Sequence, residues 1–138
     1  MNQQQIMQIQ MMEQEGQQLS QQLQLIEQNT FDMQELELSL EEINKKESKE
    51  ILANLGKGIY IPVEIKDKKL IVEVGKKNFV KKTISETKDI IMEQMVKLVS
   101  AKTQILDRLE VLQIEIHGLM QNIQKERAIE EDKEEKKK

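Results

Sequence analysis

Hydrophobic side chains along the first part of the chain recur in alternating steps of three and four residues, which is the spacing of a coiled-coil seam. The seam positions are Ile9, Met12, Gly16, Leu19, Leu23, Ile26, Thr30 and Met33. After Met33, the apolar residues Leu36, Leu40 and Ile43 restore the rhythm after two successive steps of three, which predicts a stammer with local overwinding. Glutamine fills many of the intervening positions and is a competent helix former, so we expect one helix over residues 3–48.

A second and more regular seam occupies the last part of the chain. Its positions are Ile84, Lys88, Ile91, Met95, Leu98, Lys102, Ile105, Leu109, Leu112, Ile116, Leu119 and Ile123. Lys88 and Lys102 are the polar members of this seam, and Gly16 is the gap in the first one. We expect the two helices to pair antiparallel as a long coiled-coil hairpin, with Gly16 at about the height of Gly118, so that both helices are weakened there.

The ends of the second helix can also be predicted. Thr83 is followed three residues later by Glu86, which is the spacing of a capping box, and Ser85 is the other candidate for the start of the helix. We therefore expect the helix to cover residues 84–129. The charged residues 130–138 are expected to form a disordered, solvated tail.

Between the two helices the hydrophobic period changes to two, the alternation of half-buried β-strands. Turns at residues 56–58, 66–69 and 75–78 divide this segment, so we expect two short β-hairpins within residues 50–82. The side chains expected to face inward are Ile59, Ile61, Val63, Ile65, Leu70, Val72 and Val74.

These strands need a partner from outside the chain, because an isolated hairpin is marginal in water and four short strands do not bury both faces. Pro62 fits this interpretation, since proline in a strand is confined to edges, bulges and strand starts. We therefore expect the inward-facing residues to be subunit-assembly residues. The expected fold class is α+β, a coiled-coil hairpin with two β-hairpins at its connecting end.

The composition favours this fold over a large globular core. The 138 residues include no Trp, two Phe and one Tyr, and 33% of them are charged, so we expect a single domain over residues 1–138 built from narrow buried stripes. The chain has no cysteine and no apolar run near the ~18 residues of a membrane span. We expect a cytoplasmic protein without disulfides and without a membrane partner.

The net charge of −4 argues against a general nucleic-acid binder, which needs a clustered basic surface. One local cluster is basic. Its lysines are Lys66, Lys68, Lys69, Lys76, Lys77, Lys81 and Lys82. They either form a basic face for an acidic partner or solvate the strand edges and block edge-to-edge pairing.

The segment from residue 55 to residue 86 resembles the central region of the archaeal prefoldin α subunit. The resemblance rests on a Leu-Gly-x-Gly turn with Gly56 and Gly58, an apolar strand ending in Val-Gly at Gly75, and a basic strand that runs into the second helix. Flanking heptad helices of similar length extend the resemblance over nearly the whole chain.

This resemblance implies a hexamer of two α and four β prefoldin subunits, whose β-hairpins form an intersubunit β-barrel from which the coiled coils project. It implies an ATP-independent chaperone subunit that captures unfolded proteins at the coiled-coil tips and transfers them to a group II chaperonin. A structural coiled-coil spacer or adaptor subunit without client-holding activity is the alternative. A nucleic-acid-binding arm ranks below both.

Apolar residues that lie off the seam are the candidates for client capture. Ile6, Met7 and Met11 are left exposed by a two-helix coiled coil, and methionine adapts to irregular partners. A locally wider seam explains these residues equally well. The candidate client-binding residues are Ile6, Met7, Ile9, Met11, Met12, Leu119, Met120, Ile123 and Ile129.

Residues for catalysis are not apparent in the sequence. The turn from Gly56 to Gly58 lacks the Gly-Lys-Ser/Thr ending of a phosphate loop. His117 is the sole histidine, and no nucleophile-base pair or paired metal ligand accompanies it. We therefore expect a protein that is not an enzyme and that uses no cofactor or metal.

Overall fold

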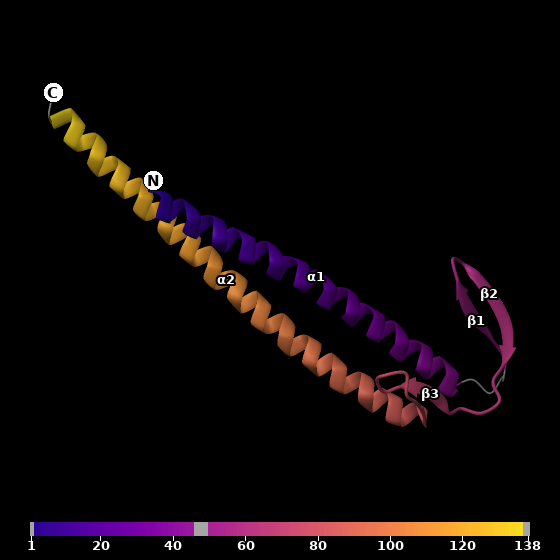
Figure 1. Ribbon diagram of the computed structural model, residues 1–138. Helices are drawn as coiled ribbons and strands as arrows, with labels where there is room; N and C mark the ends of the chain where they lie inside the picture. The colour runs from indigo at the N-terminus through magenta and orange to yellow at the C-terminus, as the bar shows by residue number, and fades with distance from the viewer. Residues whose placement is uncertain (1, 46–49, 137–138) are drawn as a thin grey trace. The chain divides into compact units, whose positions relative to one another are not determined.

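The computed structural model describes residues 2–45 and 50–136, and its elements can be followed from indigo α1 to the yellow end of α2 in Figure 1. In chain order they are α1 (Gln3–Lys45), β1 (Glu50–Gly56), β2 (Ile59–Glu64), β3 (Leu70–Glu73), β4 (Phe79–Lys82) and α2 (Ile84–Lys136). The predicted α+β class, with two long helices and two β-hairpins between them, is confirmed. The expected end of the first helix at Ser48 lies outside the described residues.

The second helix is longer than expected. It continues to Lys136 and so includes most of the segment that was expected to be a disordered tail. Glutamate and lysine are good helix formers and support one another when they stand four residues apart, so a charged composition does not by itself end a helix. Lys133 and Lys136 lie in the last turn, where positive charge complements the helix dipole.

The chain divides into two compact units, and both helices contribute to each. The terminal unit contains the described residues up to Gln28 and those from Val99 onward, and the central unit contains residues 29–98. In the terminal unit, Glu27 of α1 is paired with Lys102 and Glu15 with Arg108. Residues later in α1 therefore pair with residues earlier in α2, so the two helices of this unit run antiparallel, as the two seams predict.

The terminal unit buries its seam residues. Ile9, Ile105, Leu112 and Ile123 form its buried apolar side chains, and the seam residues between them are mostly half-buried. At Gly16 the seam lacks a side chain, and an open groove of about 540 Å³ lies there against Leu112 and neighbouring residues of α2. The groove agrees with thinner packing at Gly16. Its α2 residues lie between Leu109 and Ile116, so the expectation that Gly118 stands at the height of Gly16 is wrong.

The central unit has its core where the helices approach the hairpins. Leu40, Ile84 and Ile91 form a buried cluster, against which Met33, Ile43, Leu70 and Met95 pack. The predicted step of three from Met33 to Leu36 is wrong, because Leu36 is 45% exposed while Glu37 is half-buried on the seam. Leu40 belongs to the seam in either register, and Ile43 packs against the cluster while Asn44 is exposed, so the two successive steps of three run from Glu37 to Ile43 and leave Leu36 outside.

Charged side chains span the helices at the two polar seam positions. Lys88 Nζ lies 3.8 Å from Glu41 Oε1 in the central unit, and Lys102 Nζ lies 3.9 Å from Glu27 Oε1 in the terminal unit. Pairs with this much solvent access contribute little to stability, about 0–1 kcal/mol each. Their arrangement nevertheless explains how lysine is accommodated at a seam position.

The start of α2 carries the predicted capping box. The backbone N–H of Glu86 donates to Thr83 Oγ1 at 3.1 Å, and the backbone N–H of Thr83 donates to Glu86 Oε1 at 3.4 Å. These bonds satisfy donors that a helix start leaves free. Hydrogen bonds from Thr83 also hold the pKa of the Glu86 carboxyl below its ordinary value.

The two hairpins form two separate antiparallel sheets. In the first, Ile51 lies opposite Val63 and Ala53 opposite Ile61. Residues directly opposite each other share a face of the sheet, so these four apolar side chains lie together. The expected alternation of the strand after Gly58 is therefore present, and its apolar face extends onto β1.

Candidate functional site

The candidate client-binding residues divide into two groups. Ile9 and Ile123 are buried in the seam, and Met12 and Leu119 are half-buried. The exposed members are Ile6, Met7, Met11, Met120 and Ile129. The seam residues therefore pack between the two helices, and the off-seam residues are exposed for contact with another protein.

Met7 and Met11 form the centre of this exposed set. They stand four residues apart on α1, so they share one face of the helix, and they are 60% and 66% exposed. No residue from Asn2 to Met12 carries a charged side chain. This uncharged surface suits apolar contact, because binding there desolvates no charged group of this segment.

The helix that carries these methionines is ordered from its first turn. The backbone N–H of Gln5 donates to Asn2 Oδ1 at 2.8 Å, and the backbone N–H of Asn2 donates to Gln5 Oε1 at 3.2 Å. Gln5 Nε2 also donates to Glu126 Oε2 of α2 at 3.3 Å. The Asn-x-x-Gln spacing is a readable capping signal that the sequence interpretation missed.

Exposed apolar residues also occur away from the predicted set, and the sequence interpretation missed them. Met92 is 63% exposed and Val96 is 64% exposed on α2 in the central unit, beside Asp89, Glu93 and Lys97. Exposure alone therefore does not single out Met7 and Met11. Met7 is distinguished by the absence of charged residues within five positions in sequence, whereas Glu13 and Glu15 follow Met11 closely.

The candidate assembly residues are mostly uncovered within the single chain. Ile59, Ile61 and Val74 are exposed, and Val63, Ile65 and Val72 are half-buried. Leu70 differs, because it packs against the buried helical cluster around Leu40. The expectation that these residues lack a partner within the chain is therefore wrong for Leu70.

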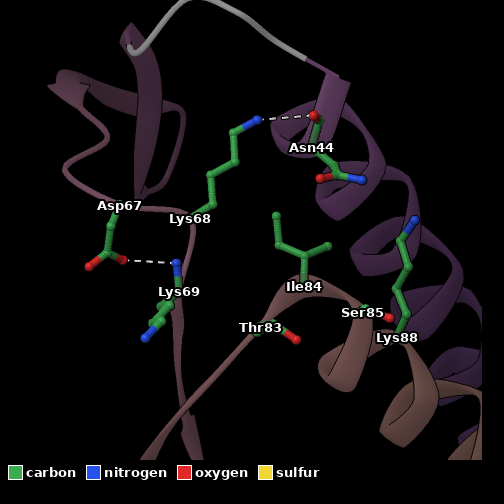
Figure 2. Close-up of a pocket in the computed structure, with 8 residues that line it drawn as sticks. All are labelled: Asn44, Asp67, Lys68, Lys69, Thr83, Ile84, Ser85 and Lys88. Atoms are coloured by element: carbon green, nitrogen blue, oxygen red, sulfur yellow. Dashed lines mark hydrogen bonds between the residues drawn. The ribbon is translucent and has the colours of Figure 1, made fainter.

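A contact between the β2–β3 connection and α1 explains the position of Leu70. Figure 2 shows Lys68 reaching the end of α1, where its Nζ donates to the carbonyl oxygen of Asn44 at 3.1 Å. The backbone N–H of Lys69 donates to Asp67 Oδ1 at 2.8 Å and fixes the turn before β3. Positive charge at a helix C-terminus is favourable, so Lys68 ties the strand that follows to the helices.

An open pocket of about 570 Å³ lies at this contact, within the central unit. Its lining residues, drawn in Figure 2, are Asn44, Asp67, Lys68, Lys69, Thr83, Ile84, Ser85 and Lys88. The pocket lies where the turn before β3 meets the end of α1 and the start of α2. In the part of the chain that the structure describes, no group of three or more His, Cys, Asp or Glu side chains is placed to hold a metal ion.

The helices of the described residues include none that is both long enough and apolar enough to cross a membrane. His117 lies exposed on α2, with Nε2 at 3.1 Å from Gln121 Nε2. This placement is that of a surface histidine bonded one turn along its own helix.

Comparisons with known proteins give two findings and one negative result. A family model described as Prefoldin subunit matches residues 3–128. The cryo-EM structure of filamentous PFD from Methanocaldococcus jannaschii superposes with a TM-score of 0.71 at 13% sequence identity, over 81% of this chain and 94% of that chain. At this identity the likeness shows the fold alone. No curated protein sequence gives a significant match.

Proposed function

Since the chain belongs to the prefoldin family, we propose that it is an ATP-independent chaperone subunit that captures unfolded proteins at its coiled-coil ends and transfers them to a group II chaperonin. Family membership implies assembly with other prefoldin subunits. The proposed partner is a β-type subunit, in a hexamer of two α and four β subunits acting in the cytoplasm.

The exposed pair Met7 and Met11 is the observation that carries the capture step. Thioether side chains are flexible and polarisable, so they contact apolar segments of different shape. Because both side chains are already exposed, capture does not need to open the buried seam. Ile6 adds branched apolar surface in the same turn of α1.

The uncovered faces of the hairpins support the proposed assembly. Ile61 and Val63 share a face with Ala53 and Ile51, and Val72 lies opposite Val80 in the second hairpin. Two-stranded sheets with apolar faces gain stability when further strands or a second layer cover them. We assign that covering role to the hairpins of neighbouring subunits, which would together form the intersubunit barrel.

Suppression of aggregation tests the proposal. The assembled complex is mixed with a chemically denatured client, and light scattering is followed without nucleotide. Replacing Met7→Gln and Met11→Gln keeps helix propensity and side-chain length but adds polar groups, so we expect several-fold weaker suppression. Met92→Gln is the matched control, since Met92 is equally exposed in the central unit.

The same assay separates chaperone from spacer. A chaperone subunit suppresses aggregation in the wild-type assembly and loses this effect with the Met7 and Met11 substitutions. A wild-type assembly that leaves client aggregation unchanged would establish the spacer or adaptor role instead.

A further inference from the structure

The turn that closes the β3–β4 hairpin has an unusual pair of central residues. The backbone N–H of Asn78 donates to the carbonyl oxygen of Gly75 at 2.9 Å, and the backbone N–H of Val74 donates to the carbonyl oxygen of Asn78 at 2.9 Å. Lys76 has a φ of 46° and Lys77 a φ of 61°. A four-residue turn with positive φ at both central positions is a type I′ turn.

Lysine is a poor choice for these positions. Type I′ turns strongly favour Asn-Gly or Gly-Gly, because a Cβ in the left-handed region crowds the following carbonyl oxygen. In the β1–β2 hairpin, Gly58 occupies the second central position at a φ of 78°, and only Lys57, at 53°, is strained. In the β3–β4 hairpin, both central turn positions are lysines with a strained, positive φ.

Contacts within the chain do not explain the two lysines. Both are exposed, and within the described residues neither takes part in an ion pair. Strained residues that gain nothing locally point to a function of the side chain itself. The property that lysine has and asparagine or glycine lacks is positive charge.

One face of the strands that flank this turn carries a further lysine, together with a glutamate and two exposed apolar side chains. Lys81 lies opposite Ile71, and Phe79 lies opposite Glu73, so these four side chains share a face of the sheet. Ile71 and Phe79 are 70% and 62% exposed. The opposite face carries Leu70, Val72, Val80 and Lys82, the side that includes the proposed assembly residues.

We propose that the β3–β4 hairpin binds an acidic peptide segment of a partner protein, with its carboxylates on Lys76, Lys77 and Lys81 and an apolar side chain against Phe79. The site is independent of client capture by Met7 and Met11. Glu73 stands within the same face and repels any negatively charged group of a ligand. A peptide can space its carboxylates to avoid Glu73, whereas the phosphates of a nucleic-acid backbone follow one another at a fixed spacing. The net charge of −4 also weighs against nucleic acid, so a peptide with spaced carboxylates is the better fit.

A trade-off between stability and binding tests this site. The probe is a poly-glutamate peptide that contains interspersed leucines, titrated by calorimetry into the full-length protein in its assembled form. Lys76→Asn with Lys77→Gly installs the preferred turn and removes two charges. We expect the unfolding midpoint to rise while affinity for the peptide falls about tenfold.

Three further variants complete the test. Lys76→Arg with Lys77→Arg keeps both charge and strain, so it should bind as the wild type does. Lys81→Gln should weaken binding without the gain in stability. Lys57→Asn relieves the same kind of strain in the other hairpin, so it should raise the midpoint and leave peptide affinity unchanged.

Several outcomes overturn the proposal. Absence of peptide binding by the wild type, or unchanged affinity in the Lys76→Asn, Lys77→Gly variant, would reduce the lysines to solubilising residues. A lower unfolding midpoint in that variant would remove the strain argument. Tighter binding of polyuridylate RNA than of the peptide, with the same dependence on Lys76 and Lys77, would assign the surface to nucleic acid instead.

Discussion

Arg108 of α2 holds Glu15 of α1 through two hydrogen bonds, from Nε to Oε1 at 2.8 Å and from Nη2 to Oε2 at 3.1 Å. This two-point contact fixes the planes of both groups, unlike the single long contact between Lys102 and Glu27. The hydrogen bond from Arg108 lowers the pKa of the Glu15 carboxyl, and Glu15 raises the pKa of the Arg108 guanidinium. The pair therefore aligns the two helices of the terminal unit in one register.

The effect of Arg108→Ala should depend on pH. Because the pKa of Glu15 is lower in the folded protein than its ordinary value of 4.5, the pair stabilises the fold above that value and loses its contribution as pH falls through the lowered pKa. Thermal unfolding should show a small deficit for the variant near pH 7 that disappears in acid. Lys102→Ala should show a smaller deficit, and an Arg108→Ala deficit that is constant with pH would contradict this account.

Filling the seam gap at Gly16 should stabilise the terminal unit. A Cβ at Gly16 meets nothing within 4 Å, and the same is true of Gly118. Alanine at either position should gain about 1 kcal/mol of helix propensity in urea unfolding. Gly16→Leu should exceed Gly16→Ala by up to about 2 kcal/mol, because its side chain enters the groove beside Leu112. Equal stability of the leucine and alanine variants would show that the groove does not accept a side chain.

Two leucines four residues apart test the helix register. Leu40 is 4% exposed in the central cluster, so Leu40→Ala should cost about 2–5 kcal/mol in the free energy of unfolding. Leu36→Ala should cost less than about 1 kcal/mol, since the side chain is largely exposed. Comparable costs for both substitutions would restore the step of three from Met33 to Leu36 that the sequence predicts.

Oxidation should weaken client capture if Met7 and Met11 perform it. Hydrogen peroxide transfers one oxygen atom to the thioether sulfur and is itself reduced to water, which turns an apolar side chain into a polar sulfoxide. Peroxide-treated wild-type assembly should lose several-fold in aggregation suppression, measured after the peroxide is removed. Met7→Leu with Met11→Leu should be protected, whereas Met92→Leu should not. Loss of activity in all three proteins would place the sensitive methionine elsewhere.

Much of the helical structure follows from the sequence, because heptad spacing and capping chemistry are local signals. The buried positions Ile105 and Leu112 lie on the predicted seam, and Thr83 caps α2 as expected. The fate of Leu36 did not follow, since the leucine four residues later fits both registers. The packing of Leu70 did not follow from the sequence either, because it accompanies a long-range contact between Lys68 and the end of α1.

The functional surfaces were predictable only in part. The spacing of Met7 and Met11 indicates that both lie off the seam, but the sequence does not show that Met92 and Val96 are equally exposed. The turn at residues 75–78 was expected, whereas the left-handed conformation of both its lysines was not, because this pair is rare at the centre of a type I′ turn.

Site-specific photocrosslinking is the most direct test of client capture by the terminal unit. A photoreactive amino acid is placed at Met7, Met11, Met92 or Val96 in turn, and each assembly is irradiated with a denatured client in the absence of nucleotide. The account predicts strong crosslinks to the client from Met7 and Met11 and weak ones from Met92 and Val96. Equal crosslinking from all four positions, or stronger crosslinking from the central unit, would contradict it.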